Sequence, residues 1–220
     1  MPQVPMLKAV ALRLGSALLV LLVVHLPVTA QQLSADRTRC VNRGKVFSLD
    51  EQIDGCTAIL QLDRRTAANR AGIYTDRGRA YHDKGDVDRA IADYNEALKI
   101  NPNLVPAYIN RGVAYYEKKD YDRAIADYNE AIRIDANFAA AYNNRAWTYF
   151  KVGKAAQGLP DAERSLQLRP DSFYALDTRG HIFEALGRRE EAIADFRRVL
   201  AIDPSIESSK DALKRLGAAP

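Results

Sequence analysis

Apolar residues recur at helical spacing along most of the chain, and the pattern repeats every thirty-four residues. The segments Asp88–Ile100 and Asp122–Ile134, which read DRAIADYNEALKI and DRAIADYNEAIRI, differ at two residues only. A period of this length is typical of proteins built from stacked helical hairpins. We therefore predict an all-α fold of antiparallel helix pairs. Counted from Ala71, the repeated units are 71–104, 105–138, 139–172 and 173–206.

Residue size at fixed positions of the unit predicts how the helices pack. Small residues at the eighth and twentieth positions let two helices approach closely, and aromatic residues at the fourth, eleventh and twenty-fourth positions fill the space beside them. These aromatic residues are therefore core residues first. The turn between the two helices is expected at the fifteenth position, where glycine suits a helix end. The residues at that position are Gly85, Lys119, Gly153 and Gly187.

The unit 139–172 departs from this pattern in its second helix. Pro160 falls inside the expected helix, while Gly158 and Ala162 replace a small alanine and an aromatic residue. Because proline is tolerated only in a first turn, we expect this helix to begin late, near Leu159. The departure indicates either a repeat that has drifted or a kink that alters the stack at this point.

The recurring residues resemble the pattern of the tetratricopeptide repeat family. That pattern is a helical hairpin with an aromatic residue, glycine, tyrosine, alanine, a second aromatic residue, a second alanine and proline at these offsets. The match is strong in 71–138, good in 173–206 and weaker in 139–172. The resemblance implies a right-handed superhelical solenoid whose first helices line a concave groove. It also implies binding of a peptide or a partner protein, with no catalysis.

Charged residues depart from the family at two positions, the first of which usually holds an apolar residue. Arginine stands at the seventh position of every unit, and aspartate stands at the twenty-third. A partly buried arginine needs a carboxylate partner. We predict one such pair per repeat, within or between units, as a structural ladder rather than an anion site. The residues are Arg77, Arg111, Arg145 and Arg179 with Asp93, Asp127, Asp161 and Asp195.

The first thirty residues differ in composition from the rest of the chain. Lys8 and Arg13 are their only charges, and Leu14–Leu26 is almost wholly apolar. This run is short for a membrane span, which takes about 20 residues. We therefore predict that 1–30 is the signal peptide of an exported bacterial protein, periplasmic or secreted, with no stable membrane insertion after cleavage. The alternative is an uncleaved N-terminal anchor.

The segments that flank the regular units are predicted to cap the two ends of the stack. In 31–70, a degenerate repeat, Cys40 and Cys56 form an even pair, which in an exported protein suggests a disulfide. The alternative is two buried free thiols. Cys40 and Phe47 keep the spacing of first-helix residues in the regular units, which places both in the first helix of this repeat. The segment 207–220 is predicted to be a capping helix and tail.

Charge and motif content argue against several functional classes. The net charge is +4, and removal of 1–30 leaves 30 basic residues against 28 acidic ones. The two signs are interleaved, so nucleic-acid binding is not expected. His82 and His181 lie on different units, and no nucleophile, phosphate-loop or zinc motif occurs in the sequence. We predict no enzyme activity, no metal site and no cofactor.

The groove side of the first helices is the candidate binding surface. Its middle is rich in aromatic and amide side chains, and asparagine can bond the backbone of an extended peptide. Trp147 is either an anchor for a partner or packed against the neighbouring helix. The clamp with which some family members hold a C-terminal carboxylate is incomplete here. The candidate residues are Asp76, Arg79, His82, Asn110, Val113, Tyr116, Asn143, Asn144, Trp147, Phe150, Asp177 and His181.

The leading functional prediction is a non-catalytic scaffold that binds a partner protein or an extended peptide in this groove. Two alternatives stand beside it. One is an envelope factor that binds glycan or peptidoglycan by stacking on Trp147, Tyr116 and Phe150. The other is a structural subunit that self-associates end to end through its caps.

Overall fold

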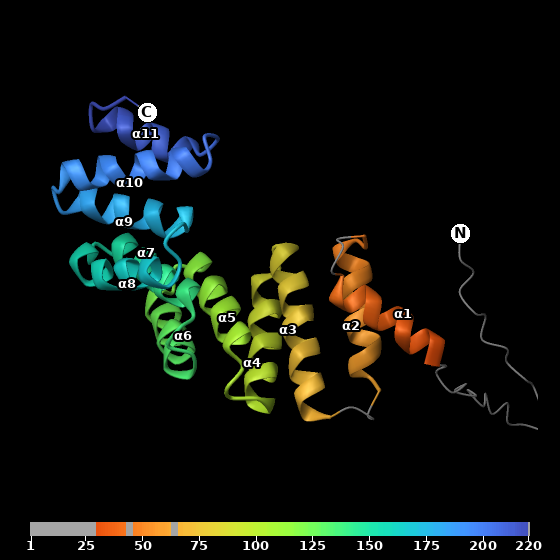
Figure 1. Cartoon of the computed structure of the whole chain (residues 1–220). Coiled ribbons are helices and arrows are strands. Elements are labelled where there is room, and N and C mark those ends of the chain that lie inside the picture. Colours follow the sequence, from red (N-terminus) through yellow and green to blue (C-terminus); the bar gives the residue numbers. More distant parts are fainter. Residues whose placement is uncertain (1–29, 43–45, 63–65, 220) are drawn as a thin grey trace, which may run out of the picture.

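The computed structural model describes residues 30–42, 46–62 and 66–219, and this part of the chain is all-helical, with eleven helices and no strand. The predicted all-α solenoid of helix pairs is confirmed (Figure 1). The helices are α1 (Ala30–Val41), α2 (Leu49–Leu60), α3 (Ala67–Asp83), α4 (Val87–Ile100), α5 (Val105–Glu117), α6 (Tyr121–Ile134), α7 (Ala139–Lys151), α8 (Ala155–Leu168), α9 (Phe173–Ala185), α10 (Arg189–Ile202) and α11 (Glu207–Arg215).

Each helix packs against the next one in the chain, so the pairs stack in sequence order and the stack turns along its length (Figure 1). The first helices of successive pairs, from α1 to α9, also contact one another along one side. We call this side the inner face. The core between helices is built from small residues against aromatic rings. A Cβ atom added to Gly112 would lie 2.6 Å from Cε1 of Tyr128, so only glycine fits there.

The turn between the two helices of each regular unit uses a left-handed backbone. Gly85, Gly153 and Gly187 adopt it at φ values of 86°, 76° and 74°. Lys119 stands at the same position of the second unit and is held at φ 61°. An L-residue pays about 1–2 kcal/mol for this conformation, because its Cβ approaches the following carbonyl oxygen. The second unit therefore carries local strain that its neighbours avoid.

We expect Lys119→Gly to raise the free energy of unfolding by about 0.5–1 kcal/mol. Relief of the backbone strain stabilises the folded protein, and the greater freedom of glycine in the unfolded chain offsets only part of that gain. Urea unfolding followed by circular dichroism measures the change. The matched control is Lys118→Gly, one residue earlier at φ −72°, which should lower stability. An equal loss in both variants would contradict the prediction.

The second helix of the third unit corrects one prediction. Helix α8 begins at Ala155, in register with α4, α6 and α10, and not near Leu159. The helix is already formed when the chain reaches Pro160, since the Gly158 N–H donates to the Lys154 carbonyl at 3.3 Å. Because proline has no N–H, only the bond to the carbonyl four residues earlier is lost, and the ring lies exposed to solvent.

The third unit has smaller side chains in the core of its second helix, and a residue of the fourth unit fills the space. A Cβ atom added to Gly158 would lie 2.7 Å from the Ala146 carbonyl oxygen, so α7 and α8 approach closely here. Ile182 of α9 is fully buried in the same cluster as Ala146 and Ala162. Its side chain supplies the apolar volume that an aromatic residue supplies in the other units.

The N-terminal pair confirms the disulfide and corrects the expected helix. Cys40 of α1 and Cys56 of α2 are bonded through their sulfur atoms. Helix α1 ends at Val41, however, so Phe47 lies in the connection and does not share a helix with Cys40. The cause is Asn42, which has a φ of 40° and holds the Phe47 N–H and carbonyl with its side-chain amide over 3.0 and 2.8 Å.

The two ends of the chain differ in how far they are described. The predicted signal peptide, apart from Ala30, lies outside the described residues. Among the residues that are described, none belongs to a helix long and apolar enough to cross a membrane. At the C-terminal end, α11 buries Ala212 and Leu213 completely and turns Glu207, Asp211 and Lys214 outward.

Candidate functional site

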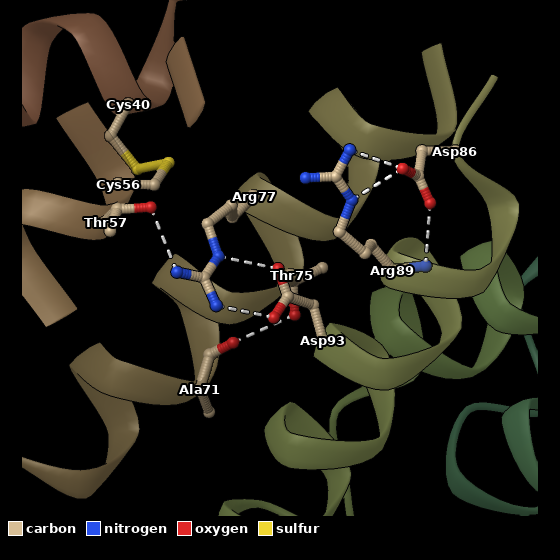
Figure 2. Close-up of polar contacts among 9 residues, drawn as sticks. All are labelled: Cys40, Cys56, Thr57, Ala71, Thr75, Arg77, Asp86, Arg89 and Asp93. Atoms are coloured by element: carbon tan, nitrogen blue, oxygen red, sulfur yellow. Dashed lines mark hydrogen bonds and ion pairs between the residues drawn. A yellow bond between two sulfur atoms is a disulfide. The ribbon is translucent and has the colours of Figure 1, made fainter. Parts of the chain in front are cut away.

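The predicted arginine and aspartate residues lie together inside each regular unit. Arg77 of α3 donates from Nε and Nη2 to the two carboxylate oxygens of Asp93 on α4 (Figure 2). The other three units repeat this two-point contact, and all eight distances lie between 2.6 and 2.8 Å. The arginine side chains are 18–21% exposed and the aspartates 3–11%. The equivalent pairs are Arg111–Asp127, Arg145–Asp161 and Arg179–Asp195.

In the first three regular units, the third guanidinium nitrogen links the unit to the one before it. Nη1 of Arg111 donates to Oδ1 of Asn95 on α4 at 2.6 Å, and Arg145 bonds Asn129 on α6 over the same distance. Arg77 reaches the hydroxyl of Thr57, beside the disulfide, at 3.0 Å (Figure 2). Sequence reasoning missed these links. The signal was present, because the two asparagines occupy the same position of the two most similar repeats.

Aromatic rings enclose the arginines of this ladder. The guanidinium carbon of Arg77 lies 5.5 Å from the ring centre of Tyr74 and 5.9 Å from that of Tyr81. The hydrogen bond to Asp93 raises the pKa of Arg77, which therefore stays charged. In Arg77, Arg111 and Arg145, the nitrogens Nε, Nη1 and Nη2 each have an acceptor, so the geometry favours a structural role over anion binding.

A second set of contacts crosses the junctions between units on the inner face, and we single out one contact at each junction. We call these contacts the inner rungs. From α3 to α11 they are the hydrogen bond from His82 to Glu117 at 2.8 Å, the hydrogen bond from Trp147 to the Tyr116 hydroxyl at 2.8 Å, the stacking of Phe150 on His181 with ring centres 5.8 Å apart, and the ion pair of Arg215 with Glu184 at 2.9 Å.

Trp147 belongs to the rungs, and the structure places it against both neighbouring helices. Its indole N–H is used by Tyr116 of α5, and its ring lies 5.8 Å from that of His181 on α9. Phe150 lies 5.2 Å away on its own helix, and the Lys151 ammonium lies 5.5 Å from the ring centre. The packing alternative thus describes this residue, although the side chain is only half-buried on the inner face.

The acidic candidates at the two ends of the inner face have partners within the chain. Asp76 lies 3.3 Å from Nη2 of Arg79. Asp177 accepts a hydrogen bond from the Ser209 hydroxyl of α11 at 2.8 Å, and His181 lies 3.6 Å from its carboxylate. Since α11 supplies Ser209 to Asp177 and Arg215 to Glu184, it contacts α9 as a further first helix would.

The amide side chains in the middle of the inner face are different. Asn110 and Val113 of α5 and Asn144 of α7 are half-buried, and neither side-chain amide has a hydrogen-bond partner within the described residues. Asn143 adds a buried Oδ1 atom for which the described part of the chain supplies no donor. The centre of the inner face therefore holds polar groups for which the described residues supply no hydrogen-bond partner.

The groups that could support catalysis or metal binding are dispersed. His82 lies on α3 beside Glu117, and His181 lies on α9 beside Asp177 and Glu184. Within 30–42, 46–62 and 66–219, no cluster of three or more His, Cys, Asp or Glu side chains could hold a metal ion.

A hollow of about 760 Å³ lies between the α1–α2 connection and α3, at the N-terminal end of the inner face. We call it the N-terminal hollow. It was not predicted, because the connection lies outside the repeated pattern. Its lining joins the candidate residues Asp76 and Arg79 to a wall that comes from the capping pair. The lining residues are Val41, Asn42, Phe47, Leu49, Gln52, Asp76, Arg79 and Asp83.

Comparisons with known families and structures agree with this architecture. The family model described as TPR repeat matches residues 78–119 and 114–153, and the model described as Tetratricopeptide repeat matches 173–206. No curated protein matches the chain. A TPR protein from Parabacteroides merdae is similar in structure, with a TM-score of 0.71 at 17% identity, over 86% of this chain and 75% of that one.

Two further solved structures show the same fold. MamA has a TM-score of 0.63 at 22% identity, over 79% of this chain and 95% of its own. YrrB, described as a TPR protein with an unusual peptide-binding site, has a TM-score of 0.60 at 19% identity, over 74% of this chain and 84% of its own.

Proposed function

Because this chain belongs to the tetratricopeptide repeat family, we propose that it is a non-catalytic scaffold whose inner face holds an extended segment of a partner protein. The fold supports protein or peptide binding in general terms, and one of the structural neighbours is a peptide-binding protein by its description. The side chains that would hold the segment are inferred from the inner face of this chain.

The observation that carries the proposal is the pair of unpartnered amides at Asn110 and Asn144. They stand thirty-four residues apart, at the same position of successive first helices. A side-chain amide offers both a donor and an acceptor, which match the carbonyl and N–H of a peptide backbone. An extended segment repeats those two groups along its length, so it can meet both amides. The polar groups left half-buried in the free protein then gain partners.

The alternative functions have less support. Glycan binding by stacking needs free ring faces, whereas Trp147, Phe150 and His181 lie against one another. End-to-end self-association needs an apolar terminal surface, whereas the outer residues of α11 are polar. We keep the export hypothesis as part of the proposal. The disulfide is compatible with an oxidising compartment, and 1–30 has the composition of a signal peptide.

We expect the double variant Asn110→Ala/Asn144→Ala to recover at least tenfold less partner when the protein is cross-linked and purified from its own compartment. Loss of the hydrogen bonds at one amide costs about 1–3 kcal/mol, and tenfold corresponds to about 1.4 kcal/mol. Quantitative mass spectrometry of the recovered proteins gives the ratio.

The matched control is Asn103→Ala/Asn137→Ala, which removes two amides from exposed turns at an equivalent repeat position. Partner recovery should match that of the unmodified protein. If the inner-face variant also retains full recovery, while both variants keep the original melting temperature, the inner face is not the binding surface.

A further inference from the structure

We propose that the segment held by Asn110 and Asn144 carries an apolar side chain, which packs over Val113 at the junction of α5 and α7. This inference rests on the proposed function and deepens it, since it adds the chemical class of residue that the partner must present. The apolar groups that carry the inference begin one helical turn beyond the two amides.

The two central first helices each present an amide followed by two apolar or aromatic side chains. Residues three apart on a helix lie on the same face, so each series forms a continuous stripe on the inner face. All six side chains are half-buried. We call the residues that follow each amide the apolar stripes. The two series are Asn110, Val113 and Tyr116 on α5, and Asn144, Trp147 and Phe150 on α7.

Charged groups stand at three edges of the apolar stripes, and the amides stand at the fourth. Glu117 and Lys151 are the last residues of α5 and α7. The flanking first helices carry ionisable side chains where α5 and α7 carry the stripes, namely Arg79 and His82 on α3, and His181 and Glu184 on α9. The centre of the inner face is therefore neutral and largely apolar, whereas its two ends are charged.

Val113 is the shortest side chain at its position of the repeat. The other three regular units place Arg79, Trp147 and His181 there. A ligand side chain over Val113 therefore has a longer side chain on each neighbouring first helix, and the one on α7 is the indole of Trp147. Contact with the indole does not need the free ring face that glycan stacking needs, because burial of apolar surface is not directional.

The polar atoms of the apolar stripes already bond each other. The Trp147 indole N–H donates to the hydroxyl oxygen of Tyr116 at 2.8 Å. A polar ligand side chain over Val113 would lose its bonds to water and gain little in return, which costs free energy. An apolar side chain gains free energy from the same burial. The stripes therefore select an apolar residue over a polar one of equal size.

The path of an extended segment brings one of its side chains to this place. Neighbouring helices lie about 8–10 Å apart, and an extended chain advances about 3.3 Å per residue. About three residues of the segment therefore bridge the distance from Asn110 to Asn144. Side chains of an extended chain alternate in direction, so at least one of these residues points from the amides toward Val113.

The test compares two blocked pentapeptides that differ in the polarity of one side chain. Acetyl-Gly-Gly-Leu-Gly-Gly-amide carries leucine, and acetyl-Gly-Gly-Asn-Gly-Gly-amide carries asparagine, which has nearly the same shape. Titration of the isotope-labelled full chain, followed by amide and indole chemical shifts, should give saturable shifts on α5 and α7. We expect the leucine probe to bind at least about fivefold more tightly, as partial burial of one leucine side chain allows.

Two variants with the same chemical change make the test specific. Val113→Thr keeps the shape of the side chain and replaces a methyl group by a hydroxyl, so it should remove most of the fivefold preference and leave the affinity for the asparagine probe unchanged. Val152→Thr, at a half-buried valine in the turn after α7, should change neither affinity. Equal binding of the two probes, a preference that survives Val113→Thr, or the absence of saturable shifts with the leucine probe would each overturn the inference.

Failure of this inference can be told apart from failure of the proposed function. Asn110→Ala/Asn144→Ala should weaken both probes by a similar factor, because the amides bond the backbone that the probes share. If the two probes bind equally but those substitutions reduce partner recovery, the amides hold a segment and the apolar class is wrong. If the leucine preference depends on Val113 but the amide variant retains full partner recovery, the apolar stripes stand and the role of the amides falls.

Discussion

Asp127→Ala lowers the free energy of unfolding by about 2–3 kcal/mol. Its carboxylate, 6% exposed, is the partner of Nε and Nη2 of Arg111 at 2.8 and 2.6 Å. Removal of one member of a fully buried pair costs about 3–5 kcal/mol, because the remaining charge is left uncompensated. Arg111 is 19% exposed, so water recovers part of that cost.

Urea unfolding measures this loss, and a neighbouring residue provides the control. Asp122→Ala removes an exposed carboxylate from the first turn of the same helix, where the charge contributes about 0.3–1 kcal/mol through the helix dipole. The double variant Arg111→Met/Asp127→Ala should recover part of the stability, since no charge is left buried. Similar losses for Asp122→Ala and Asp127→Ala would mean that the ladder does not stabilise the fold.

Cys40→Ala/Cys56→Ala lowers the stability of the N-terminal pair by about 3 kcal/mol, the value expected when a cross-link closes a loop of about sixteen residues. Both cysteines are almost completely buried, at 1% and 0% exposure, so the alanines fill the space poorly. Because each unit of a solenoid contacts only its neighbours, the effect should be local.

Hydrogen exchange separates a local effect from a global one. Protection of amides in α1 and α2 should fall, protection in α3 should fall less, and protection in α9 and α10 should stay unchanged. Treatment of the unmodified protein with dithiothreitol under conditions that reduce the bond should give the same pattern. A uniform loss along the chain would contradict the assignment of the disulfide to the stability of the cap.

The periodic part of the sequence was sufficient to predict the helix pairs, because the same small and aromatic residues recur at fixed positions in most of the repeats. It also identified Arg111 and Asp127 as a pair, since two opposite charges recur at half-buried positions. The predicted start of α8 was wrong, and the reason is physical. Local proline chemistry argued for Leu159, but packing of Gly158 and Ile182 holds the whole helix in register.

Features that occur once in the chain could not be predicted in the same way. The α1–α2 connection has no second copy in the chain, and the hydrogen bonds between the Asn42 side chain and the Phe47 backbone occur only there. The N-terminal hollow is lined in part by Asn42 and Phe47, so it has no repeated signal either. The inner rungs all join neighbouring units on the inner face, but each is a different kind of contact. No residue type therefore recurs along the sequence to predict them.

The links of Arg111 and Arg145 to the preceding units have a mechanical consequence. The junction between the first and second units and that between the second and third each have two hydrogen-bonded contacts, an arginine link and an inner rung. At the junction between the third and fourth units, Arg179 makes no hydrogen bond to the preceding unit within the described residues, and ring stacking remains. Hydrogen-bonded links therefore hold the first three units to one another, whereas aromatic and apolar packing, including that of Ile182 against Ala146, holds the fourth unit to the third.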